Sequence, residues 1–154
     1  MNHPNLGLYR AGFTLVEILA VLSILALVAG LLAPVLLPSA SSQLKHNTSL
    51  LLNALRDTRL YALRQQVPAS LLIDTAQATF QVPGRTQPNQ LAGDLHMQVA
   101  TATQEVLDAQ RAGIRFFPDG RSGGGRITLH QADQIQHIDI AWLTGRIQVH
   151  ATTP

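Results

Sequence analysis

The sequence contains no cysteine, and only 13% of its 154 residues are charged. The lack of cysteine excludes disulfide bonds and thiolate metal sites, but it does not indicate a compartment, because many exported bacterial domains also lack disulfides. The formal net charge is +2, and no long block of one charge occurs. Charge alone therefore does not predict a strong electrostatic surface for nucleic acid.

The sequence also lacks recognisable catalytic and metal-binding motifs. No nucleophile elbow, HExxH helix or paired acidic motif is present, so we predict neither an enzyme nor a cofactor. His137 and Asp139 would share a strand face because their spacing is two, and His130 lies nearby. No third ligand from an identifiable motif accompanies them, so we predict surface histidines and no required metal.

One long hydrophobic run occupies the N-terminal part of the chain. Between Phe13 and Leu37 the only polar side chains are Thr14, Glu17 and Ser23. The last twenty residues of the run would span about 30 Å as a helix, which is enough to cross a bilayer. Glu17 is unexpected there, since an unpaired charge near the bilayer centre costs roughly 2.5 to 3.5 kcal/mol. The glutamate therefore indicates a charged partner or a specific role.

The residues in front of this run indicate that a cleavage site precedes it. MNHPNLGLYRAG is a short polar leader with Arg10 near its end, and F-T-L-V-E follows directly. This pattern resembles the type III signal of type IV prepilins and pseudopilins, which prepilin peptidase cleaves between glycine and phenylalanine. The matched positions are Gly12 before the cut, Phe13 as the new N-terminus, Glu17 as the fifth mature residue and Pro34 as the twenty-second. A single arginine in the leader is a slight departure.

The resemblance implies a role for each matched position. It implies that Phe13 is N-methylated after cleavage and that Glu17 pairs with the N-terminal amine of a neighbouring subunit. Such a buried pair contributes about as much stability as apolar packing would, whereas burial of one charge without its partner costs several kcal/mol. The pair would therefore fix the register of assembly. Pro34 removes one helical hydrogen bond, and Gly30 weakens the same turn, where related filaments bend or melt this helix.

Conventional secretion is the alternative for this segment. The small residues Ser39, Ala40 and Ser41 could serve a signal peptidase, and the mature chain would then begin near Ser41. The hydrophobic run is longer than the roughly 7 to 15 residues of an ordinary secretory signal, which disfavours this alternative.

A second helix is predicted beyond Pro38. Its apolar and small side chains recur at alternating spacings of four and three: Leu44, Thr48, Leu51, Leu55, Thr58 and Ala62. This period predicts an amphipathic stem helix that packs on a core and ends at Pro68. Arg56, Arg59 and Arg64 lie mostly off that stripe, and we predict that they form a solvated face.

After Pro68 the period of the pattern changes from 3.6 to 2. ASLLID and ATFQV predict a hairpin around residues 74–77, and HMQVAT follows the polar loop PGRTQPNQLAGD. GIRFF, RITLH, HIDIAW and GRIQV then alternate apolar and polar residues, which is typical of half-buried antiparallel strands. The predicted fold is α+β and type IV pilin-like: a long hydrophobic helix, an amphipathic stem, and a small antiparallel β-rich head that resembles a sandwich.

The segment IRFFPDGRSGGGRITL is the most distinctive part of this head. Its P-D-G turn and three consecutive glycines predict a hairpin with a flexible tip. A phosphate-binding loop is the alternative, with Arg121 and Arg126 beside glycine amides. The GxxxxGK[ST] pattern is missing and no helix clearly follows, which disfavours phosphate binding.

This segment and the later AWLTGRI resemble the C-terminal part of the GspH/FimT family, which holds minor pseudopilins of type II secretion and minor pilins of type IV pili. The shared features are an I-x-F-x-P-D-G-R block at Ile114–Arg121, a glycine-rich turn, and a final strand opened by Thr144–Arg146. Residues 83–113 match no motif. Members that take up DNA carry a basic GRxR motif, whose second arginine is replaced here by Gln148.

The resemblance implies a minor pseudopilin with a leader (1–12), a transmembrane and assembly helix (13–38), a stem (39–67) and a periplasmic head (68–154). It implies single-pass anchorage in the inner membrane and a place at or near the tip of a pseudopilus that helps export folded proteins. Its partners would be prepilin peptidase, the other minor pseudopilins, the major pseudopilin and exported cargo. The alternative is a FimT-like minor pilin for DNA uptake, with Arg121, Arg126 and Arg146 contacting the polyanion.

Overall fold

The computed structural model describes residues 14–36, 39–102 and 105–152, and the side chains of the same residues except 31–36 and 152. The chain divides into two compact units, Met1–Pro38 and Ser39–Pro154. The predicted cleavage site at Gly12 and Phe13 lies outside the described residues.

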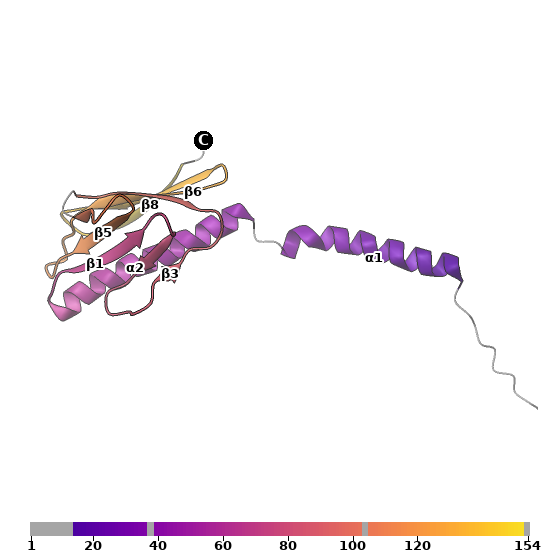
Figure 1. The fold of residues 1–154 in the computed structure, drawn as a ribbon, viewed down its shortest axis with the longest axis horizontal. Helices are drawn as coiled ribbons and strands as arrows, with labels where there is room; N and C mark the ends of the chain where they lie inside the picture. Colours follow the sequence, from indigo (N-terminus) through magenta and orange to yellow (C-terminus); the bar gives the residue numbers. More distant parts are fainter. Residues whose placement is uncertain (1–13, 37–38, 103–104, 153–154) are drawn as a thin grey trace, which may run out of the picture. The chain divides into compact units, whose positions relative to one another are not determined.

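The first unit contains helix α1, Leu15–Leu36 (Figure 1). Thr14 precedes it, and the Oγ1 atom of Thr14 accepts a hydrogen bond from the backbone N–H of Glu17 at 3.2 Å. This is one half of a capping box, in which threonine and a glutamate three residues later begin a helix. The helix continues through position 34, so Pro34 lies within α1. Among the described residues, no helix has an apolar stretch long enough to cross a membrane.

The second unit begins with helix α2, Ala40–Gln65, which Ser39 caps by accepting a hydrogen bond from the N–H of Ser42 at 3.2 Å. The helix ends where Gln66 adopts a left-handed conformation with φ of 55°. The predicted apolar stripe is confirmed, because each of its members is buried: Leu44, Thr48, Leu51, Leu55, Thr58 and Ala62. Its period of 3.6 residues places all of them on one side of α2.

The structure adds Asn47 to this buried face. Its side-chain amide nitrogen donates to the carbonyl oxygen of Ala92 at 2.8 Å, and its Oδ1 atom accepts from the N–H of Ala92 at 3.0 Å. A fully buried amide keeps its place in a core only when such partners satisfy it. Asn47 therefore ties α2 to the loop before the fourth strand.

Eight strands within the described residues form two antiparallel sheets of four strands each (Figure 1). The first sheet has the order β3-β2-β1-β5, and the second has the order β4-β6-β7-β8. The strands of the first sheet are β1 (Ala69–Asp74), β2 (Thr79–Gln81), β3 (Asn89–Gln90) and β5 (Arg111–Phe116). Those of the second are β4 (His96–Ala100), β6 (Gly125–Gln131), β7 (Gln134–Ile140) and β8 (Ile147–Thr152). The predicted α+β fold with an antiparallel head is confirmed.

The two sheets and α2 share one hydrophobic core. One face of each strand enters it, as the alternation in the sequence predicts. Leu71, Ile73, Ile114 and Phe116 come from the first sheet, Ile127, Leu129, Ile138 and Ile140 from the second, and Leu44, Leu51 and Leu55 from α2. The sheets therefore present their other faces to solvent, where polar side chains gather.

The glycine-rich segment does not form the predicted hairpin. Strand β5 pairs with β1, whereas β6 pairs with β4 and β7, so the chain between β5 and β6 crosses from one sheet to the other. Its backbone makes an isolated bridge between Phe116 and Ser122. The prediction was wrong because turn residues specify a change of direction but not the strand partner. The short strand β3, inside the predicted polar loop, was also missed.

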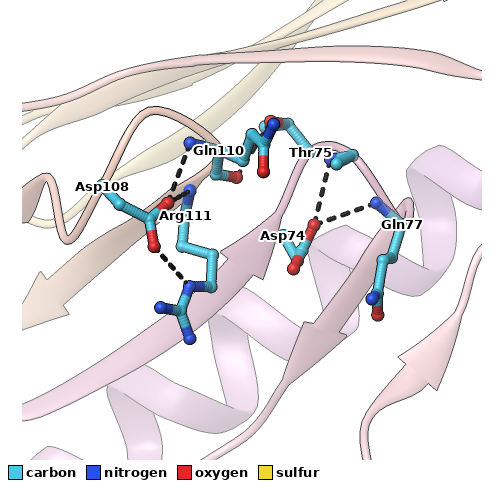
Figure 2. A network of polar contacts seen from close by, with 7 residues as sticks. Asp74, Thr75, Gln77, Asp108, Gln110 and Arg111 are labelled. Atoms are coloured by element: carbon cyan, nitrogen blue, oxygen red, sulfur yellow. Dashed lines mark hydrogen bonds and ion pairs between the residues drawn. The ribbon is translucent and has the colours of Figure 1, made fainter.

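Two turns at one end of the first sheet are tied together (Figure 2). Asp74 and Asp108 each cap their own turn by accepting backbone N–H groups two and three residues later. Thr75 joins the turns, since its N–H and its hydroxyl donate to the carbonyl oxygen of Gln110 at 2.8 and 2.9 Å. The N–H of Gln110 and the side chain of Arg111 hold the pKa of Asp108 below its usual value.

Candidate functional site

Helix α1 presents large apolar side chains on all of its sides. Ten of them have exposed fractions between 44% and 76%: Leu15, Val16, Ile18, Leu19, Val21, Leu22, Ile24, Leu25, Leu27 and Val28. Apolar surface of this extent marks a site of membrane or subunit contact. Glu17 is the one charged residue in the sequence of this helix. The first unit therefore offers a continuous apolar surface with a carboxylate near its start.

Glu17 lies in the first turn of α1, where the helix dipole favours a negative charge. That interaction is worth about 0.3 to 1 kcal/mol at an exposed helix end. It is smaller than the cost of roughly 2.5 to 3.5 kcal/mol for a lone charge near a bilayer centre. The helix dipole alone therefore would not compensate this carboxylate near a bilayer centre.

In the second unit, the loop after β5 (residues 117–124) meets the loop after β7 (residues 141–146). The N–H of Ser122 donates to the carbonyl oxygen of Trp142 at 2.9 Å. Gly145, with φ of 59°, lies against Gly120, and a Cβ atom at position 145 would overlap the carbonyl oxygen of Gly120. The P-D-G-R and T-G-R motifs of the sequence are thus structural partners.

Helix α2 contacts the same pair of loops through Arg59. The Nη2 atom of Arg59 donates to the carbonyl oxygen of Thr144 at 3.0 Å. Its Nε atom is buried and has no hydrogen-bond partner among the described residues. Arg59 therefore anchors the 141–146 loop to α2 and retains one unused donor.

A groove runs between α2 and the start of β8. Its volume is about 410 Å³, and it is lined by Arg56, Arg59, Leu60, Leu63, Thr144, Arg146 and Ile147. None of the three arginines forms an ion pair with a carboxylate in the described part of the chain. We call this feature the arginine groove. It combines positive charge with apolar walls.

The arginines singled out in the sequence differ in their surroundings. Arg121 donates to its neighbour Asp119 at 2.6 Å. The N–H and the side chain of Arg121 hold the pKa of Asp119 below its usual value. Arg126 donates to both carboxylate oxygens of Asp139, at 2.5 and 3.1 Å. Of the three candidates, Arg146 alone lines the arginine groove.

Arg56 and Arg59 were predicted to form a solvated face, and their place in the groove was missed. Arg56 and Leu60 are four residues apart, as are Arg59 and Leu63, which puts the members of each pair side by side on α2. That spacing could have signalled a mixed basic and apolar surface. The opposite wall of the groove comes from residues far along the chain, which no local pattern reveals.

Four histidines lie on the solvent-facing side of the second sheet: His96, His130, His137 and His150. His96 and His130 are cross-strand neighbours with ring centroids 6.4 Å apart. His137 shares a hydrogen bond of 3.1 Å between its Nδ1 atom and the hydroxyl of Thr128. Within the described residues, no group of three or more His, Cys, Asp or Glu side chains could hold a metal ion.

Comparison with known proteins gives matches at both ends of the chain. The family model of type II transport protein GspH matches residues 47–144, and that of the prokaryotic N-terminal methylation motif matches residues 8–33. Type II secretion system protein H of Xanthomonas campestris pv. campestris is 32% identical over 139 residues, which cover 89% of this chain and 81% of that protein.

Two solved structures are similar at low identity. The type IV minor pilin FimU of Pseudomonas aeruginosa is 12% identical, with 73% of this chain and 96% of that chain covered and a TM-score of 0.48. The minor pseudopilin EpsH of the Vibrio cholerae type 2 secretion system is also 12% identical, with 74% and 97% covered and a TM-score of 0.48.

Proposed function

The chain belongs to the type II transport protein GspH family, and we propose that it acts as a minor pseudopilin of the type II secretion system. The observation that carries this role is the presence of both family features in one chain, a GspH match over residues 47–144 and a methylation motif over residues 8–33. The family consists of structural subunits, so the described surfaces are proposed to act by binding other proteins.

We propose that the chain is made with a leader of residues 1–12, which prepilin peptidase removes between Gly12 and Phe13. Methylation of the new N-terminal amine of Phe13 would follow. Residues 13–38 would then form the membrane and assembly segment, residues 39–67 the stem, and residues 68–154 the periplasmic head. The apolar surface of α1 supports this division, because the described residues of the first unit leave it exposed.

In the inner membrane the segment would cross once, and during assembly it would move into the pseudopilus. Glu17 would pair with the N-terminal ammonium of a neighbouring subunit. Two charges that are each costly in hydrocarbon would neutralise one another, and only one axial register of the helices allows this. Pro34 would let the helix bend or open as it packs. Glu17 thus serves as the assembly residue and Pro34 as the adaptable position.

The minor pseudopilin is proposed to sit at or near the tip of the pseudopilus. There it would contact the other minor pseudopilins, the major pseudopilin below them and, through its head, exported cargo. A head with two solvent-facing sheet surfaces and a groove has several sides on which neighbours can bind. The charge distribution supports protein contacts more than DNA uptake, because Arg121 and Arg126 each pair with an aspartate.

Intact-mass measurement of the membrane-extracted protein, from cells with and without prepilin peptidase, tests this proposal. The expected product begins at methylated Phe13 when the peptidase is present, and the uncleaved chain is expected in its absence. A mature chain beginning near Ser41 in both strains would refute it. In a strain that lacks the protein, loss of exoprotein secretion with intact DNA uptake is expected, and the reverse would indicate the pilus alternative.

A further inference from the structure

We propose that the arginine groove is a docking site for an acidic segment of a partner protein, one that carries apolar side chains between its carboxylates. The groove lies in the second unit, so this inference stands on the geometry of the head. The docking proposal goes beyond the role in secretion. It does not depend on whether α1 lies in a membrane or in a filament. Three features of the groove carry it: unpaired charge, an apolar wall and an unused hydrogen-bond donor.

The first feature is charge. Five other arginines of the head each have a carboxylate within 3.5 Å: Arg85, Arg111, Arg115, Arg121 and Arg126. Arg56, Arg59 and Arg146 have none among the described residues, although Asp57 adjoins Arg56 in the chain. Asp57 pairs instead with Arg85 at 3.5 Å. The groove therefore concentrates positive charge that the head itself does not neutralise, and a partner with carboxylates complements it.

The second feature is the apolar wall. Leu60 is 45% exposed beside the arginines, and Leu63 and Ile147 complete the same surface. Burial of such side chains favours a ligand with apolar groups of its own. Arginine is also one of the residue types enriched at the positions that dominate protein–protein binding energies. These facts favour a protein segment over a simple anion.

The third feature is the buried Nε donor of Arg59, which has no partner among the described residues. A buried donor without an acceptor is unfavourable, and a carboxylate or carbonyl oxygen that enters the groove can satisfy it if the side chain adjusts. Nucleic acid fits the surroundings less well, because a phosphate backbone needs a track of basic side chains. Arg121 and Arg126, which would extend such a track, are paired with Asp119 and Asp139.

The test uses the full chain in detergent micelles and two short synthetic peptides. One peptide alternates glutamate and leucine, and the other alternates glutamine and leucine. Titration calorimetry gives the affinity, and fluorescence of the single tryptophan, Trp142, reports on the turn that supplies Thr144 and Arg146. The glutamate peptide is expected to bind at least about tenfold more tightly than its neutral counterpart. Its affinity is expected to fall as salt is raised.

Variants locate the binding. The double variant Arg56→Gln/Arg146→Gln removes two exposed groove charges and is expected to weaken binding of the glutamate peptide about tenfold or more. The matched control Arg64→Gln/Arg111→Gln removes the same charge from outside the groove, and its affinity is expected to equal that of the wild type. Circular dichroism of each variant checks that the head remains folded.

Three results would overturn the docking proposal. Equal affinity of the wild type for the two peptides, or binding of neither, removes the role of carboxylates. Equal weakening by the control variant places the binding outside the groove. The third result is a single-stranded oligonucleotide that binds more tightly than the glutamate peptide and no longer binds the Arg56→Gln/Arg146→Gln variant. That result would make the groove a nucleic-acid site. None of these results bears on cleavage at Phe13 or on secretion, so the two proposals fail separately.

Discussion

Gly145 lies directly against the carbonyl oxygen of Gly120, and this contact joins the loop after β5 to the loop after β7. Both glycines have positive φ values, 59° and 86°, which side chains of other residues rarely permit. The two glycines belong to the two C-terminal motifs by which the sequence resembles its family. The motifs therefore maintain a packing contact of the head that also shapes one wall of the arginine groove.

Replacement of Gly145 by alanine is expected to destabilise the head by about 2 to 4 kcal/mol, because a Cβ atom meets both the carbonyl oxygen of Gly120 and an unfavourable φ. Urea unfolding followed by circular dichroism measures this. Gly123→Ala is the matched control, since a Cβ atom at position 123 would lie 3.8 Å from the Cβ atom of Arg115, an ordinary van der Waals contact. Equal stability of the Gly145→Ala variant and the control would show that the loop contact is dispensable.

Asn47→Ala is expected to cost about 1 to 3 kcal/mol, because it leaves the N–H and carbonyl groups of Ala92 without their buried partner. Asn53→Ala, on the exposed side of the same helix, removes the same chemical group and is expected to change stability by less than about 0.5 kcal/mol. Thermal or urea unfolding of both variants compares them. Similar losses at the two positions would contradict the role of Asn47 as a tie between α2 and the loop.

Stability is expected to fall in acid, partly through Asp139. The hydrogen bond from the side chain of Arg126 holds the pKa of Asp139 below its usual value. The folded state therefore binds fewer protons, so this contribution is present above the unfolded pKa of about 3.9 and is lost as pH falls through the lower folded value. Asp139→Asn should lower the free energy of unfolding at pH 7 by less than about 1 kcal/mol. It should also make the unfolding midpoint depend less on pH below pH 4.

The control for this acid dependence is Asp133→Asn, in the turn between β6 and β7. Asp133 is exposed and has no ion pair among the described residues, so its replacement is expected to leave the pH profile unchanged. Unfolding midpoints between pH 2 and pH 7 provide the comparison. A profile of Asp139→Asn that coincides with the wild type would assign the acid sensitivity to other carboxylates, such as Asp108 and Asp119.

Glu17→Gln is expected to abolish incorporation into the pseudopilus while leaving cleavage after Gly12 unchanged. Glutamine keeps the capping pattern at the start of α1 and removes only the charge, so the loss would report the ion pair and not the helix. Crosslinking of subunits in sheared pseudopili, with intact mass as the control for cleavage, measures both. Normal incorporation of the Glu17→Gln variant would show that the charge does not set the register.

The local elements of this protein follow from its sequence because each repeats with a period that the backbone imposes. The stripe from Leu44 to Ala62 has the period of a helix, and its burial follows directly from that spacing. The alternation in segments such as RITLH has the period of a strand, so the inward positions Ile127 and Leu129 were also predictable. The N-terminal motif is similarly contained in adjacent residues, which is why Glu17 could be singled out by itself.

Tertiary structure decided which of these elements meet. Strands β5 and β6 join different sheets although a turn separates them, since pairing depends on burial across the whole head. Asn47 is buried because Ala92 lies opposite it. The arginine groove exists because α2 and the start of β8, which are distant in the chain, form its two walls. A sequence specifies its local periods directly, whereas contacts between distant residues arise only when the core closes.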